Sequence, residues 1–213
     1  MTLYVPPCLW DETRAAQLLR RYWGRHADGS PRYTGSRFER LAGGGDKPCV
    51  ADHFTADDVL AVSTLSVALP ARAALRLVEP SAQDRYGVLL EQLPTDVELA
   101  DADQHLIARG GPAWQLWERL RQIDGIGPVG AGKLLARKRP RLLPVYDSVI
   151  KRVFLRPSND LGFWSDVRSS LRANDRQLVR HLRTVRALAG IGDDVSVLRV
   201  LDTMAWMCGT EDL

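Results

Sequence analysis

Apolar residues recur at helical spacing along almost the whole chain, and no segment shows the apolar–polar alternation of a half-buried strand. This periodicity predicts an all-α fold. We expect helices over residues 11–23, 56–66, 70–79, 81–93, 112–122, 128–138, 147–155, 161–172, 175–189 and 195–207. Asp11, Thr55 and Asp194 precede three of these segments, and such residues commonly cap helix N-termini. A glycine-rich stretch, residues 24–49, predicts a long loop with one short helix.

The expected helices belong to a chain that is long enough to bury a sizeable core. Its 213 residues are 45% apolar and 26% charged, which is typical of a globular protein. We expect one compact all-α unit over residues 1–213, or two lobes. The three cysteines, Cys8, Cys49 and Cys208, are odd in number and far apart, so the sequence indicates no disulfide framework.

The sequence also carries expectations about location and cofactors. The N-terminal segment lacks the basic and apolar pattern of a signal peptide. The longest uncharged apolar stretch, residues 59–71, is shorter than the roughly 20 residues of a membrane-spanning helix. We therefore expect a soluble, cytoplasmic monomer with no membrane association and no cofactor. The four histidines show no metal-ligand spacing.

A glycine turn lies between two expected helices in the segment QIDGIGPVGAGKLLARKRP, residues 122–140. Gly125 and Gly127 permit positive φ and close backbone approach, and Pro128 suits the first position of the following helix. Ile126 is expected to pack under the turn and lock the two helices together. The amides and the dipole at the start of that second helix would favour a phosphate group.

Positive charge is concentrated around this turn. Residues 119–156 carry ten basic side chains against two acidic ones, a net charge of +8, whereas the whole chain carries +3. Such a concentration is typical of a surface that binds a polyanion, and Lys133 is placed to reach a phosphate. Contacts of this kind bind the nucleic-acid backbone and carry no base information.

The spacing L-x-x-I-x-G-I-G-x-x-x-A, residues 120–131, resembles the helix-hairpin-helix motif of DNA-binding proteins. The segment PVYDSVI, residues 144–150, is similar to the catalytic-aspartate segment of the helix-hairpin-helix DNA glycosylase superfamily. Residues 112–154, the hairpin plus that segment, carry the resemblance. It implies a two-lobed helical architecture and double-stranded DNA as the partner. The residues it places on the DNA backbone are Gly125, Ile126, Gly127, Val129, Gly130 and Lys133.

The resemblance implies that Asp147 is catalytic. Asp147 lies 22 residues after Gly125, as in the endonuclease III branch of the superfamily. Breaking an N-glycosidic bond builds positive charge on the sugar, and a carboxylate beneath the sugar stabilises that charge or orients water. The target base must first leave the stack. The structural alternative is that Asp147 only caps the helix that follows it.

Several residues depart from the family pattern. Val129 stands where glycosylases that also nick DNA have a lysine nucleophile, so the resemblance implies a monofunctional enzyme. Tyr146 is inserted before Asp147, and Val149 replaces a common histidine. Only Cys208 follows the hairpin, which excludes the iron–sulfur branch. We therefore expect a divergent monofunctional DNA N-glycosylase, cytoplasmic and nucleoid-associated, that removes a modified or damaged base.

Two alternatives stay open. One is a non-catalytic helix-hairpin-helix DNA-binding protein, and the other is a helical protein-interaction domain whose basic segment contacts an acidic protein.

Further candidate contacts flank Asp147 or lie in the glycine-rich loop. Tyr146 and Ser148 are candidate pocket residues, and Tyr33, Arg37 and Phe38 are candidate DNA contacts. Aromatic and arginine side chains on a loop can stack on an extruded base or wedge into the duplex. Packing within the scaffold is the alternative. Related hairpins also imply a monovalent cation at the hairpin carbonyl oxygens.

Overall fold

The structure, a computed structural model, describes residues 3–157 and 160–211, and its regular elements are helices. Across these two ranges there is no β-strand, and one isolated bridge joins Arg25 and Pro31. The all-α prediction is confirmed. The chain divides into two compact units, one formed by Met1–Tyr33 with Pro144–Leu213 and the other by Thr34–Leu143. Each unit is described by itself below.

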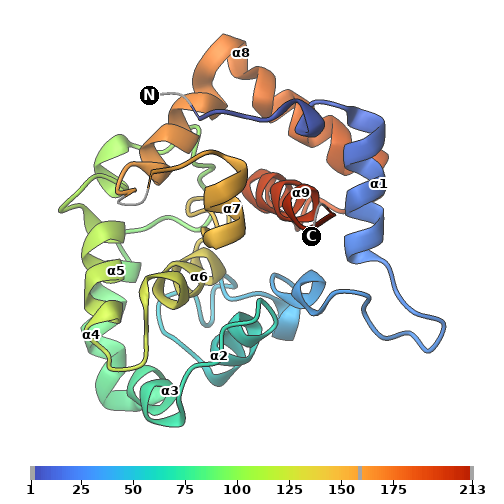
Figure 1. The fold of residues 1–213 in the computed structure, drawn as a ribbon. Helices are drawn as coiled ribbons and strands as arrows, with labels where there is room; N and C mark the ends of the chain where they lie inside the picture. The colour runs from blue at the N-terminus through green and yellow to red at the C-terminus, as the bar shows by residue number, and fades with distance from the viewer. Residues whose placement is uncertain (1–2, 158–159, 212–213) are drawn as a thin grey trace. The chain divides into compact units, whose positions relative to one another are not determined.

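The first unit is built around its last helix. Its elements are the short helix η1 (Pro7–Leu9) and the helices α1 (Glu12–Trp23), α7 (Ser148–Val153), α8 (Phe163–Leu188) and α9 (Val197–Glu211). Helix α9 packs against α1, α7 and α8 (Figure 1). Leu198, Leu201, Met204 and Ala205 recur at helical spacing on α9 and are buried, so this face forms the centre of the core.

A disulfide between Cys8 and Cys208 joins η1 to α9 within the first unit. Cys49 is a free, exposed thiol. The sequence indicated no disulfide framework, and it did not predict this single pair. The two cysteines are 200 residues apart, and they meet only because η1 packs against α9.

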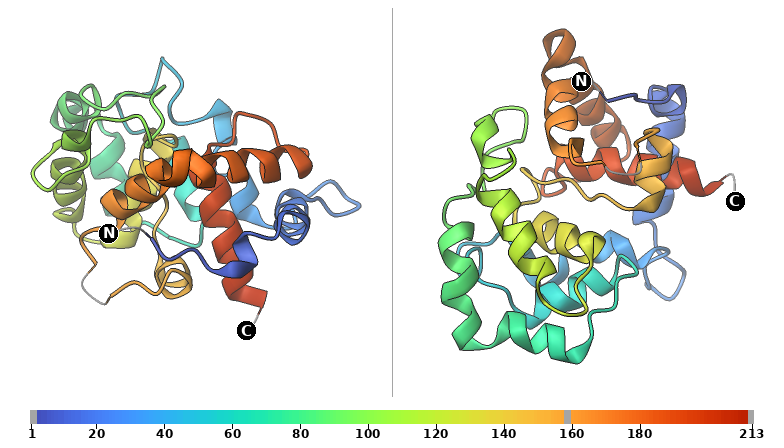
Figure 2. Two further views of the ribbon diagram at one scale, coloured as in Figure 1. Left: turned by 90° about the horizontal axis from the view of Figure 1, so that it is seen from above. Right: turned by 60° about the vertical axis from the view of Figure 1, so that its left-hand side comes forward.

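The second unit contains the glycine turn. Its elements are η2 (Thr34–Arg37), η3 (Leu41–Gly43), α2 (Ala56–Ser63), α3 (Ala71–Val78), α4 (Pro80–Leu90), η4 (Gln104–Leu106), α5 (Pro112–Arg121) and α6 (Pro128–Lys138). Helix α6 packs against α5 and α2, and α4 packs against α5 and α3. The α5–α6 pair can be followed in the right-hand view of Figure 2. The five helices α2 to α6 are therefore joined by pairwise packing, and the turn lies between two of them.

The helix predictions hold closely, with two corrections. The bounds of α6 equal the predicted ones, and Asp11 and Thr55 cap α1 and α2 as expected. The predicted helices 161–172 and 175–189 form one element, α8, whose backbone leaves helical geometry at 173–176. The prediction of Asp194 as a cap is wrong, because the Ser196 hydroxyl accepts the Arg199 amide at 3.1 Å and α9 begins at Val197.

No helix among the described residues is both long enough and apolar enough to cross a membrane.

Candidate nucleic-acid interface

The glycine turn between α5 and α6 has the backbone geometry that only glycine supports at one position. Gly125 has φ +92°, a left-handed conformation that side chains disfavour. A Cβ atom at this position would also lie 2.7 Å from Cγ of Pro70. The turn closes with the Ile126 amide donating to the Ile123 carbonyl at 2.9 Å. Glycine at 125 is therefore required by the fold itself.

Ile126 locks the turn from beneath, as predicted, because its side chain is buried. Gly127 is different. Its φ of −78° is ordinary, so Gly127 does not use the positive φ that glycine permits. Gly127 is exposed, and a Cβ atom built on it would meet no atom within 4 Å. The fold therefore does not require glycine at 127.

The first turn of α6 begins at this open position. Gly127 is the N-cap residue and provides no side-chain hydrogen bond, and Pro128 has no amide hydrogen. The amides of Val129 and Gly130 belong to the first turn, where a helix has no carbonyl partners of its own. Val129 is half-buried and Gly130 is buried. The glycine at 127 leaves the approach to these amides uncovered.

The basic residues that follow lie inside the second unit, contrary to the sequence interpretation. Lys133, Arg137, Lys138 and Arg139 are all buried. The Lys133 ammonium donates to the Leu65 carbonyl at 2.8 Å, so the predicted phosphate contact by Lys133 is corrected. Four of the ten basic side chains in residues 119–156 are thus interior and form no DNA-facing patch.

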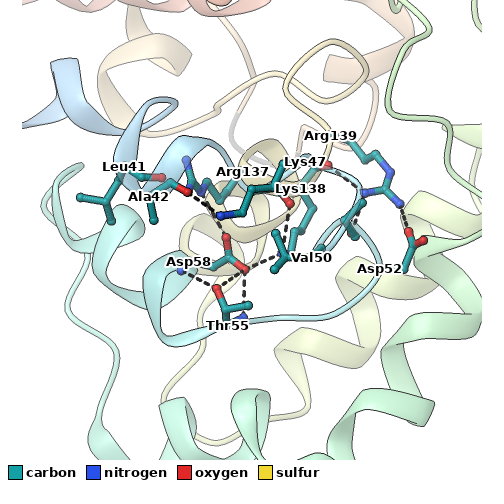
Figure 3. A network of polar contacts seen from close by, with 12 residues as sticks. Leu41, Ala42, Lys47, Val50, Asp52, Thr55, Asp58, Arg137, Lys138 and Arg139 are labelled. Atoms are coloured by element: carbon teal, nitrogen blue, oxygen red, sulfur yellow. Dashed lines mark hydrogen bonds and ion pairs between the residues drawn. The ribbon is translucent and has the colours of Figure 1, made fainter.

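Arg137 and Lys138 share one buried carboxylate (Figure 3). Arg137 Nε lies 3.1 Å from Asp58 Oδ1, and Lys138 Nζ lies 2.6 Å from Asp58 Oδ2. Arg137 also donates to the carbonyls of Phe38, Glu39 and Leu41. Lys138 donates to the carbonyls of Gly45 and Val50. Burial lowers the pKa of Lys138, and Asp58 opposes that shift.

Arg139 completes the network on its other side. Its guanidinium donates to Asp52 at 2.6 Å and to the carbonyls of Ala51, Leu90 and Leu93. Burial lowers the pKa of Arg139, and its hydrogen bond to Asp52 opposes the shift. Together the three cations hold the glycine-rich loop and the end of α4 against α6. This is a structural role.

The exposed surface beside the hairpin comes from α5. Arg121 is exposed, and its guanidinium lies 4.3 Å from the centre of the Trp117 ring. The Trp117 indole donates to the Pro128 carbonyl at 3.1 Å. Trp117 itself is half-buried, and sequence reasoning did not single it out as a functional residue. The sequence did contain a signal for the contact between Trp117 and Arg121, because the two residues are four positions apart on one helix.

Asp147 lies in the first unit, whereas the hairpin lies in the second. Its Oδ1 atom accepts the amides of Val149 and Ile150 at 3.0 and 3.1 Å. Asp147 therefore caps α7, which is the structural alternative considered for it. The carboxyl group is half-buried, and the neighbouring Ser148 is exposed.

Tyr146 is held in a polar network within the same unit. Its hydroxyl donates to Asp160 Oδ2 at 2.8 Å, and its ring stacks on Phe163 with centroids 4.0 Å apart. Burial raises the pKa of the Tyr146 hydroxyl above its ordinary value, and the hydrogen bond to Asp160 adds to the shift. Burial alone would raise the pKa of Asp160, but hydrogen bonds from Arg156, Tyr146 and Gly162 lower it overall. Tyr146 is thereby fixed in place.

The loop residues predicted to contact DNA are mainly packed. Phe38 is 1% exposed, so the prediction that it stacks or wedges is corrected, because a buried ring cannot reach a duplex without unfolding its surroundings. Tyr33 stacks on Tyr22 with centroids 5.2 Å apart and packs edge-on to Trp206. Arg37 is half-buried. These three residues are more simply explained by packing within the scaffold.

In the part of the chain that the structure describes, no three His, Cys, Asp or Glu side chains gather as a metal site. The monovalent cation at the hairpin stays a prediction. Of the hairpin carbonyls, that of Ile123 accepts the Ile126 amide and that of Pro128 accepts the Trp117 indole.

Comparison with known proteins gives one match. Residues 15–209 match the family described as "Family of unknown function (DUF6308)". No curated protein and no solved structure matches the chain.

Proposed function

The chain belongs to the DUF6308 family of unknown function, and we propose that it binds the sugar-phosphate backbone of double-stranded DNA through the α5–α6 hairpin. The single observation that carries this proposal is Gly127. It is exposed, has ordinary φ, and has nothing within 4 Å of its Cβ position. A residue that packing does not constrain to glycine is well explained by a ligand that approaches the backbone closely.

Phosphate is the ligand that suits this geometry. The first-turn amides of α6, including those of Val129 and Gly130, have no side-chain cap, and the helix dipole favours negative charge there. Arg121 is exposed beside the turn and adds a charge-assisted donor. The half-buried Trp117 ring next to it would contact sugar. Such contacts fix position on the duplex and carry no base specificity.

A bulky side chain at Gly127 is expected to block this contact. Replacing Gly127 with leucine should weaken binding of the full-length protein to duplex DNA by roughly 10-fold to 100-fold, because hydrogen bonds to a charged group are lost. The loss should be equal for unrelated DNA sequences. Fluorescence anisotropy with labelled duplexes measures it, and thermal melting checks the fold.

Gly132→Leu is the matched control for this substitution. Gly132 lies on the same helix, and its Cβ position is also open, but it follows Gly127 by five residues, which is more than one helical turn. We expect wild-type affinity from this variant. Equal affinity of the wild type, Gly127→Leu and Gly132→Leu for DNA would show that the hairpin is not part of the interface. A wild-type protein that does not bind DNA would refute the proposal.

A second candidate function is hydrolysis of an N-glycosidic bond, with Asp147 as the acidic group. The observation that favours it is that Asp147 is half-buried and not fully enclosed. In this reaction water adds to the sugar C1′ atom, the bond to the base breaks, and the base leaves with a proton. A carboxylate would stabilise the positive sugar or orient the water. Val129 at the lysine position favours a monofunctional enzyme without a Schiff base.

The two alternatives have separate signatures. A non-catalytic DNA-binding protein would show the Gly127 effect on affinity but release no base. A helical protein-interaction domain would show neither effect.

A further inference from the structure

A second, separate feature of the second unit is an arginine-lined pocket of about 260 Å³. It lies where α3, α4 and α5 meet. Its lining residues are Arg76, Arg85, Tyr86, Arg119, Gln122 and Ile123. Three guanidinium groups therefore surround one small cavity, and no acidic residue lines it among the side chains that the structure describes. We propose that this pocket binds a phosphoryl group.

The charge balance of the pocket supports an anionic ligand. Arg76, Arg85 and Arg119 are exposed at its rim, and no ion pair joins any of them to an acidic side chain among the described side chains, which exclude those of residues 81–84. Three like charges around one cavity repel each other. A bound dianion removes that repulsion and accepts several charge-assisted hydrogen bonds.

The pocket is also built to hold its shape. The Arg119 guanidinium donates to the Arg85 carbonyl at 3.0 Å, which fixes α5 to α4. Tyr86 and Ile123 are buried at 2% and 5% exposure and form an apolar base. The Tyr86 ring packs edge-on against Phe54 with centroids 5.8 Å apart. A largely pre-formed apolar base with a few charged groups around it is typical of a ligand-binding pocket.

The size of the pocket limits its ligand. A volume of about 260 Å³ lies just below the range of pockets that enclose whole drug-sized molecules. It accommodates a phosphoryl group with a small attached moiety. The phosphoryl group can come from a small phosphate monoester or from a nucleic-acid backbone, since Gln122 and Ile123 immediately precede the hairpin turn. The inference does not depend on DNA binding by the hairpin.

Arginine side-chain NMR tests the proposal directly. Full-length protein is titrated in turn with inorganic phosphate, glycerol 3-phosphate and a short duplex, and the Nε–Hε signals are followed. We expect the signals of Arg76, Arg85 and Arg119 to shift saturably. The double variant Arg76→Gln, Arg85→Gln should bind the effective probe roughly tenfold more weakly or worse, since two charged donors are lost.

The control carries the same change in charge elsewhere. Arg32 and Arg183 are exposed in the first unit, and the variant Arg32→Gln, Arg183→Gln should bind like the wild type. Saturable shifts with the free phosphates assign a small-molecule ligand, and shifts confined to the duplex assign a backbone phosphate. Absence of saturable shifts with all three probes would overturn the proposal, as would equal weakening in both double variants. Neither result would affect the Gly127 experiment.

Discussion

Asp58→Ala is expected to lower the free energy of unfolding by about 3–5 kcal/mol, because it leaves buried cations without their counter-charge. The Asp58 carboxyl group and the Arg137 and Lys138 side chains are each no more than 1% exposed. Asp58 also accepts the Thr55 amide at 3.0 Å and thereby completes the capping box of α2. One substitution therefore removes two ion pairs and the side-chain half of a capping box.

Asp57→Ala is the matched control, because Asp57 is the exposed neighbour in the first turn of the same helix. We expect its effect on unfolding to lie within about 0.5 kcal/mol of zero. Asp58→Asn keeps the shape of the side chain but removes its charge, and its effect should fall between the two. Urea denaturation measures the free energy of unfolding of all three variants. An Asp58→Ala protein as stable as the Asp57→Ala protein would show that the buried cations do not depend on this carboxylate.

Asp147→Asn is expected to reduce base release from damaged duplexes by about 10²- to 10⁴-fold, the usual contribution of a catalytic acid–base group. Asparagine caps helices about as well as aspartate. It can therefore still accept the amides of Val149 and Ile150 while it loses the negative charge. The variant should consequently keep wild-type stability and wild-type DNA affinity, which separates catalysis from capping.

The assay uses a panel of duplexes that each carry one type of damaged base, with Asp57→Asn as the control. Borohydride should trap no covalent adduct, because Val129 provides no amine. Equal base release by wild-type and Asp147→Asn protein would exclude Asp147 from the reaction. No release by the wild type from any duplex would overturn the glycosylase proposal and leave the non-catalytic alternative.

Local structure was predictable because local signals determine it. The periodicity of α6, the proline at its first position and the glycines of the turn all act within a few residues of one another. The capping residues Asp11 and Thr55 are likewise explained by contacts three residues away. The helix bounds therefore follow from the sequence to within a few residues. Ser196 was missed as a cap because Asp194, two residues earlier, is an equally good capping residue by type.

The burial of the basic segment was not predictable from charge alone. The carbonyl groups that accept from Arg137 belong to residues 96 to 99 positions earlier in the chain. A count of charges treats every arginine as exposed, but a guanidinium can be buried if enough carbonyls surround it. One signal was present in the glycine-rich loop. A Cβ atom on Gly45 would lie 2.6 Å from the Arg137 carbonyl oxygen, so this glycine permits the loop to approach α6.

The candidate site was predictable only in part for the same reason. The turn at Gly125 and the packing of Ile126 depend on neighbours in sequence, and both were expected. The positions of Lys133 and Phe38 depend on distant segments, and both side chains are buried. The pocket of Arg76, Arg85 and Arg119 draws on three helices, so no local pattern indicated it.

Backbone amide NMR during titration with duplex DNA tests the central claim most directly. The account predicts that the largest shifts occur at the amides of Gly127, Val129 and Gly130, and that they are the same for unrelated DNA sequences. The side chains of Lys133 and Arg137 are buried, so their signals should show no change from direct contact with DNA. Saturable chemical-shift changes on other surfaces, with the signals of these three amides unchanged, would contradict DNA binding by the hairpin.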